Sequence, residues 1–128
     1  MPDPSQSALV DDFLCQHIAS VPHLEALLLL RGERERRWTG TALAKALFIG
    51  ADRAGIILRD LEQRGFAQSS EEGSGEYWYH AGDGEREDML DQVQTAYRRE
   101  LVRISKLIHA RSSALGEFAR AFDWRRPS

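Results

Sequence analysis

The stretch that decides the fold runs from Trp38 to Phe66 and reads WTGTALAKALFIGADRAGIILRDLEQRGF. Thr39 is a natural N-cap, because its hydroxyl can accept a hydrogen bond from a free amide of the first helical turn. Apolar residues then recur at helical spacing along one stripe: Ala42, Leu43, Ala46 and Leu47. The pattern predicts a short amphipathic helix that starts after Thr39.

A second short helix is expected after Gly50, which interrupts the first one. Asp52 can cap this helix, and its apolar side consists of Ala54, Ile57, Leu58 and Leu61. Gly65 should end it, because glycine has no Cβ to clash in the left-handed conformation that closes many helices. Two short amphipathic helices joined by a glycine turn are typical of a helix-turn-helix.

A β-hairpin is predicted directly after the two helices. Residues 70–76 read SEEGSGE, a glycine-rich segment, and the β-prone residues Tyr77 to His80 follow. Tyr77 and Tyr79 should share one face of the second strand, with Trp78 and His80 on the other. We expect one pair to pack on the helices and the other to be partly exposed. A hairpin in this place would be a wing.

A wider set of residues carries a family resemblance: Leu24, Leu27, Leu28, Trp38, Thr39, Leu43, Ala44, Leu47, Ala54, Leu58, Leu61, Arg64, Gly65 and Phe66. With them, residues 22–81, about half of the chain, resemble the winged helix-turn-helix of bacterial transcriptional regulators, broadly the MarR and PadR groups. The whole chain, down to FARAF at residues 118–122, also resembles a small proteobacterial group of this class. The resemblance implies a DNA-binding fold, and no particular activity follows from the smaller group.

The expected fold class is mainly α with a small β-hairpin wing. We expect a flexible tail at residues 1–10, a winged helix-turn-helix domain at 11–81, and a C-terminal helical segment at 82–128. The last segment should contain one long helix and a short terminal helix. A chain of 128 residues is long enough for a single core and too short for two.

The long helix is predicted over residues 83–111 and carries an apolar stripe of Leu90, Val93, Tyr97, Leu101, Ile104 and Ile108. The stripe repeats after 11 residues, which suits a nearly straight helix. The short helix, residues 114–122, offers Leu115, Phe118 and Phe122 on one face. We expect these residues to form a homodimer interface. The alternative is that they pack onto their own chain.

Composition and charge favour a cytoplasmic protein without a cofactor. The longest apolar run, Ala26 to Leu30, is far too short for a membrane span, and the first residues lack a signal-peptide pattern. A lone Cys15 leaves no cysteine-based metal cluster, and we read His17 and His23 as structural groups. No nucleophile–base spacing or phosphate-binding loop is present, so an enzyme is not expected.

The net charge of −3 conceals a segregation of charge along the chain. Residues 98–128 hold eight basic and three acidic groups, which gives this segment a charge of +5. A polyanionic partner is therefore compatible with the acidic total, provided that local patches make the contact.

The outward face of the second helix should carry Asp52, Ile56, Arg59, Asp60 and Gln63. In a DNA reader such a face enters the major groove, where Arg can pair with guanine and Gln with adenine. The candidate DNA-binding residues are Arg36, Arg37, Lys45, Arg53, Arg59 and Gln63. Acidic groups oppose this interpretation, because phosphate repels carboxylates. They are Asp52 and Asp60 on the helix and Glu71, Glu72 and Glu76 around the wing.

Two functional hypotheses follow. The first is a dimeric regulator of transcription that binds double-stranded DNA. The second is a winged helix that serves as a protein–protein interaction module, with Ile56 as an apolar anchor at the centre of the outward face. Trp38 is expected to close the core rather than to act as a stacking platform.

Overall fold

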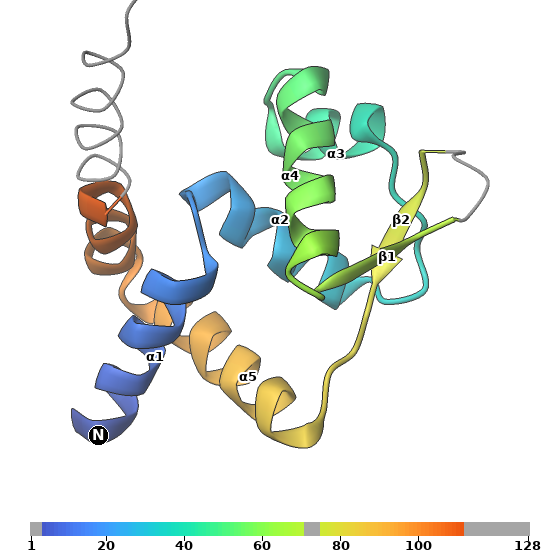
Figure 1. Ribbon diagram of the computed structural model, residues 1–128. Helices are drawn as coiled ribbons and strands as arrows, with labels where there is room; N and C mark the ends of the chain where they lie inside the picture. Colours follow the sequence, from blue (N-terminus) through green and yellow to red (C-terminus); the bar gives the residue numbers. More distant parts are fainter. Residues whose placement is uncertain (1–3, 71–74, 112–128) are drawn as a thin grey trace, which may run out of the picture.

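The computed structural model describes residues 4–70 and 75–111 (Figure 1). Over these ranges the protein is mainly helical with one small antiparallel sheet, as the sequence predicts. The elements are α1 (Pro4–His17), α2 (Val21–Gly32), α3 (Gly40–Leu47), α4 (Ala51–Gln63), β1 (Ala67–Ser69), β2 (Tyr77–Tyr79) and α5 (Gly84–Arg99). Residues 101–111 form a further helix after α5.

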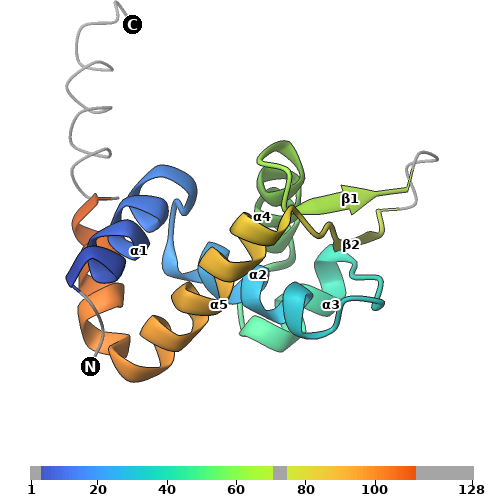
Figure 2. The same ribbon diagram turned by 90° about the horizontal axis from the view of Figure 1, so that it is seen from below.

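The elements gather around one continuous hydrophobic core. In both views α3, α4 and the hairpin lie at one end, α1 and residues 101–111 lie at the other, and α2 and α5 run between them (Figures 1 and 2). Among the described residues no single helix is long and apolar enough to cross a membrane.

The predicted N-cap of α3 and the predicted end of α4 are confirmed. The Thr39 hydroxyl accepts a hydrogen bond from the amide of Ala42 at 3.1 Å at the start of α3. The Ser20 hydroxyl does the same for the amide of His23 at the start of α2. Gly65 has a φ of +84° just after α4, where a Cβ would be strained. Local chemistry therefore sets where these three helices begin or end.

Two local details differ from the prediction. The N-cap of α4 is Gly50, and Asp52 lies within the first turn, where its charge is favourable at the positive end of the helix dipole. In α3, Ala44 is buried and Ala46 is exposed. The stripe of α3 is therefore rotated slightly from the one that spacing alone indicates.

The hairpin pairs Ala67 with Tyr79 and Ser69 with Tyr77. Trp38 joins its edge, because the backbones of Trp38 and Tyr77 exchange two hydrogen bonds of 2.6 and 2.7 Å. Tyr79 is buried, Trp78 is half-buried and His80 is exposed, so the predicted alternation of faces is confirmed. Trp38 is 1% exposed and closes the core as expected.

Helix α1 corrects the expectation of a flexible tail at residues 1–10, because it begins at Pro4. Proline is tolerated in a first helical turn, where its missing amide has no partner to lose. Val10 and Leu14 are buried in the same core cluster as Ile104 and Ile108. Contacts with residues 101–111 thus stabilise α1, a helix that the local sequence pattern does not predict from Pro4 onwards.

The predicted straight helix over residues 83–111 is also corrected. It breaks at Glu100, whose φ of −128° and ψ of 47° are not helical. Arg103 holds the bend through ion pairs of 2.9 Å to Asp11 and 3.1 Å to Glu100. The bend lets the following helix turn back towards α1, so Ile104 and Ile108 reach the core while Leu101 is 52% exposed.

A polar cluster fastens α5 to the end of α2 and to the hairpin. The Glu87 carboxylate accepts hydrogen bonds from Tyr79 and, at 2.6 Å, from Arg34. Arg31 binds Asp91 at 2.6 Å and lies 3.8 Å from Glu87. We call Arg31, Arg34, Tyr79, Glu87 and Asp91 the α5 clamp.

The clamp perturbs the titration of its members. Burial and the hydrogen bond to Glu87 raise the pKa of Tyr79 to about 12. Burial alone would raise the pKa of Glu87, but hydrogen bonds from Tyr79 and Arg34 outweigh it and hold that pKa below its ordinary value. The folded state therefore favours an ionised Glu87 carboxylate facing a protonated Tyr79.

Replacing Glu87 with glutamine should test the clamp. A lowered carboxylate pKa stabilises the fold above the ordinary value of 4.5, and that stabilisation is lost as the pH falls through the folded value. We expect Glu87→Gln to lower the free energy of unfolding at pH 7 by about 1–3 kcal/mol. It should also flatten the loss of stability below about pH 4.5. Urea denaturation at a series of pH values measures both effects. Asp88→Asn, at an exposed carboxylate of the same helix, is the control. If the stability of the two variants depends on acid pH in the same way, the clamp is contradicted.

Candidate nucleic-acid interface

The orientation of α4 is fixed by its inner face. Ala54, Ile57, Leu58 and Leu61 are all 0% exposed, as the sequence predicts. Gly40, at the start of α3, lies so close to α4 that a Cβ there would come within 3.4 Å of the Ala51 carbonyl oxygen. A helix buried this completely along one face presents the opposite face in a single orientation.

The outward face of α4 carries four exposed residues in a row. Asp52, Ile56, Arg59 and Gln63 follow one another at steps of 4, 3 and 4 residues, and each is exposed. Ile56 is 57% exposed. Arg59 makes one local hydrogen bond, from Nε to the Gly55 carbonyl at 3.4 Å. We call these four residues the α4 stripe.

Asp60 does not belong to the stripe, which corrects the sequence-based expectation. Its side chain is 25% exposed and lies 3.3 Å from His23 Nε2 and 3.0 Å from Arg64 Nε. Burial lowers the pKa of His23, with the Asp60 charge acting in the opposite direction. Asp60 is therefore drawn towards α2, and Arg64 compensates its charge, so one of the groups expected to repel phosphate is withdrawn.

Two arginines of the loop before α3 stack on tryptophan rings beside β2. The Trp38–Tyr77 pairing draws the preceding loop against the sheet, and the guanidinium of Arg36 lies 3.8 Å from the Trp38 ring centre. Arg37 lies 4.4 Å over the Trp78 ring, whose Nε1 donates a hydrogen bond to Gln68 at 3.1 Å. Stacking on an indole restricts a long side chain and leaves its N–H groups available.

All six predicted DNA-binding residues are exposed: Arg36, Arg37, Lys45, Arg53, Arg59 and Gln63. Arg53, Arg59 and Gln63 share α4, Lys45 lies on α3, and the two loop arginines lie at the hairpin. Arg36 also forms an ion pair of 3.4 Å with Glu33. Glu71 and Glu72 lie outside the described residues, and Glu76 is half-buried. The support that Trp78 gives Arg37 was not foreseen, because the two are 41 positions apart in sequence.

Phe48 is a functional candidate that sequence reasoning missed. It ends α3 in the left-handed conformation, with φ of 57° and ψ of 47°, and its amide donates to the Ala44 carbonyl. Its ring is 94% exposed. A left-handed conformation is costly for a residue with a Cβ, and an exposed ring adds no packing. The sequence signal is its position two residues before Gly50 in a turn that glycine would suit.

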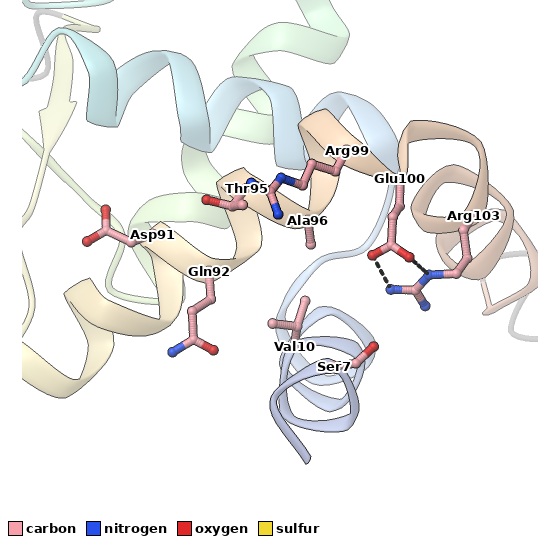
Figure 3. Close-up of a pocket in the computed structure, with 9 residues that line it drawn as sticks. All are labelled: Ser7, Val10, Asp91, Gln92, Thr95, Ala96, Arg99, Glu100 and Arg103. Atoms are coloured by element: carbon pink, nitrogen blue, oxygen red, sulfur yellow. Dashed lines mark hydrogen bonds and ion pairs between the residues drawn. The ribbon is translucent and has the colours of Figure 1, made fainter. Parts of the chain in front are cut away.

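A groove of about 240 Å³ lies between α1 and α5. Figure 3 shows Val10 of α1 facing Ala96 of α5, with polar side chains around them. The lining residues are Ser7, Val10, Asp91, Gln92, Thr95, Ala96, Arg99, Glu100 and Arg103. Asp91 and Glu100 are already paired with arginines, whereas Arg99 makes no ion pair with the described residues. The groove has room for a small molecule and carries charges of both signs.

The expected dimerisation residues are distributed differently. Leu90, Val93, Ile104 and Ile108 are at most 3% exposed within their own chain, so they are core residues and offer no surface to a second copy. Tyr97 is half-buried and Leu101 is exposed. Leu115, Phe118 and Phe122 lie outside the described residues. The alternative of packing onto the own chain is thus confirmed for the four buried positions.

Within residues 4–70 and 75–111 no group of three or more His, Cys, Asp and Glu side chains is arranged to hold a metal ion. The chain matches no family model, and the comparisons with curated proteins and with solved structures find no match either.

Phe48 yields a prediction about stability. Phe48→Gly should raise the free energy of unfolding by about 0.5–1 kcal/mol, because glycine takes the left-handed conformation without strain. Phe48→Ala removes the ring but keeps the Cβ, and it should leave stability nearly unchanged because the ring packs on little. Thermal unfolding of the two variants makes the comparison. A Phe48→Ala variant clearly less stable than the wild type would show that the ring does pack in the folded protein. A Phe48→Gly variant no more stable than Phe48→Ala would show that the left-handed backbone carries no strain.

Proposed function

We propose that residues 22–81 form a winged helix-turn-helix that binds double-stranded DNA and that the protein regulates transcription. In this assignment α3 and α4 are the two helices, α4 is the recognition helix, and the β1–β2 hairpin is the wing. The observation that carries the proposal is the α4 stripe: a rigid helix exposes Arg59 and Gln63, the side-chain types that pair with guanine and adenine, while its inner face is buried.

The charges around the proposed DNA-binding face favour DNA more in the folded structure than the sequence alone indicates. Asp60 is compensated by Arg64, and Arg37 adds positive charge beside β2, whereas Arg36 is paired with Glu33. Lys45, Arg53 and Arg59 are exposed on the two helices. Affinity that depends on phosphate contacts falls steeply with salt, with a slope of about −0.9 for each phosphate neutralised. A few exposed basic side chains per protomer imply a modest affinity for DNA, which the binding of two protomers to one duplex would strengthen.

A homodimer remains part of the proposal, on a reduced set of residues. With four of the predicted positions buried in the core, the remaining candidates among the described residues are Tyr97 and Leu101. Leu115, Phe118 and Phe122 keep the apolar pattern that motivates a dimer, and they follow directly on the helix at residues 101–111.

Protein binding is the second candidate function, and Phe48 favours it. An aromatic ring that is 94% exposed in a strained turn is the type of residue that anchors protein interfaces. In this alternative, Phe48 and Ile56 would contact a partner protein and the exposed arginines would form a polar rim around them.

Gel retardation with a random duplex library, followed by sequencing of the retained DNA, tests the proposal. Arg59→Ala should lose about 1–3 kcal/mol of discrimination for the preferred sequence, roughly a factor of 5 to 150. Arg98→Ala, which removes another exposed arginine, on α5, is the matched control and should keep the preference. If the wild-type protein retards no duplex at low salt, the DNA proposal fails. Recovery of a protein partner that Phe48→Ala abolishes would then support the alternative.

The dimer is tested separately by light scattering at micromolar concentration. The expected mass is twice the chain mass of 14.5 kDa. Leu101→Glu should weaken the dimer, since it introduces a charge at an exposed apolar position. Leu9→Glu, at a similarly exposed leucine on α1, should not. A wild-type mass of one chain would remove the dimer from the proposal.

A further inference from the structure

Ile56 is the one member of the α4 stripe with no polar group. It is 57% exposed. Among the described residues, it is the only large apolar residue of α4 that is exposed. Its neighbours along the stripe are Asp52 on one side and Arg59 on the other. The fold does not require an aliphatic side chain here, because the inner face of the same helix supplies all of the burial.

We propose that Ile56 reads the 5-methyl group of a thymine in the major groove. This inference rests on the proposed DNA binding and deepens it, because it specifies a base that the bound sequence must contain. Base edges in the major groove are polar, and the thymine methyl is the apolar group that they present. A branched aliphatic side chain on the reading face can therefore gain free energy from the methyl group of thymine, which the other three standard bases lack.

The position of Arg59 limits where the thymine can lie in the bound DNA sequence. Residues 56 and 59 are separated by about 4.5 Å along the helix axis, since each residue rises 1.5 Å. Successive base pairs are about 3.4 Å apart. If Arg59 pairs with guanine, the thymine read by Ile56 should lie within one or two base pairs of that guanine. The preferred site should thus combine both bases in a short block.

The surroundings of Ile56 favour a base contact over a protein contact at this position. A protein anchor is effective when it fills a water-free pocket among other apolar groups. Along the α4 stripe the adjacent residues are Asp52, Arg59 and Gln63, which would all have to be desolvated by a protein partner. In a major groove Arg59 and Gln63 find acceptors and donors on base edges and on water.

Replacement of thymine by 2′-deoxyuridine in the selected duplex tests the inference directly, because it removes the methyl group and keeps base pairing. We expect substitution of a single thymine in one half-site, next to the guanine block, to weaken wild-type binding about fourfold, the effect of one buried methyl group. Ile56→Ala should bind the two duplexes equally well. Ile56→Val, which keeps a branched side chain, should retain part of the difference.

The matched control is Leu9→Ala, which shortens an exposed aliphatic side chain on α1, away from α4 and from the proposed dimer positions, and should respond to deoxyuridine as the wild type does. Wild-type binding that is indifferent to deoxyuridine at every thymine would overturn the inference while leaving the DNA proposal intact. A library that yields no preferred sequence would also overturn the inference, because the thymine contact is sequence-specific. A wild-type protein that retards no duplex at low salt would remove both. A protein partner whose recovery depends on Ile56 while no duplex is retained would assign the residue to a protein interface instead.

Discussion

The complete burial of one face of α4 is the constraint on which the rest of the structure depends. Ile57, Leu58 and Leu61 are 0% exposed, and full burial of such a side chain contributes about 1.5–3 kcal/mol. Because neighbouring positions on a helix differ by about 100°, a rotation by one residue would move these side chains out of the core. The composition of the outward stripe is therefore a consequence of core packing, and any surface that α4 presents is held as firmly as the core itself.

Helix α5 is fastened to α2, the hairpin and the end of α4 by polar contacts as well as by packing. The α5 clamp joins α2, β2 and α5 through the Glu87 carboxylate, and Arg86 reaches from α5 to the Gly65 carbonyl at 2.7 Å while stacking on Phe66. Two of these contacts end at the close of α4 and at the start of the hairpin. A ligand or a second copy that displaced α5 would thus act on the two elements proposed to contact DNA, and the groove beside Ala96 lies on that same helix.

Sequence reasoning succeeded where the determinants are local and failed where they are distant. Thr39 and Gly65 act within one turn of themselves, and the inner face of α4 follows from its period, so all were predictable. The start of α1 at Pro4 depends on contacts with residues near 104, and the bend at Glu100 depends on Arg103 pairing with Asp11. At the candidate site, exposure could be predicted from helical phase. The inward turn of Asp60 could not, because its partner His23 belongs to another helix.

The α3–α4 region holds two apolar residues that the fold does not need, and they differ in a way that bears on function. Ile56 lies on a regular helix among polar neighbours and costs only the exposure of its side chain. Phe48 carries the further cost of a left-handed backbone, which glycine would avoid. Stability alone would favour glycine at position 48, so Phe48 is better explained by a contact outside the chain. Ile56 is a single exposed aliphatic residue, which stability neither selects nor removes. Because Phe48 precedes α4 by only three residues, a partner that reads the α4 stripe from the side of its first turn would be close to that ring. One bound molecule could therefore use both residues, with the helix providing selectivity and the turn providing additional contact area.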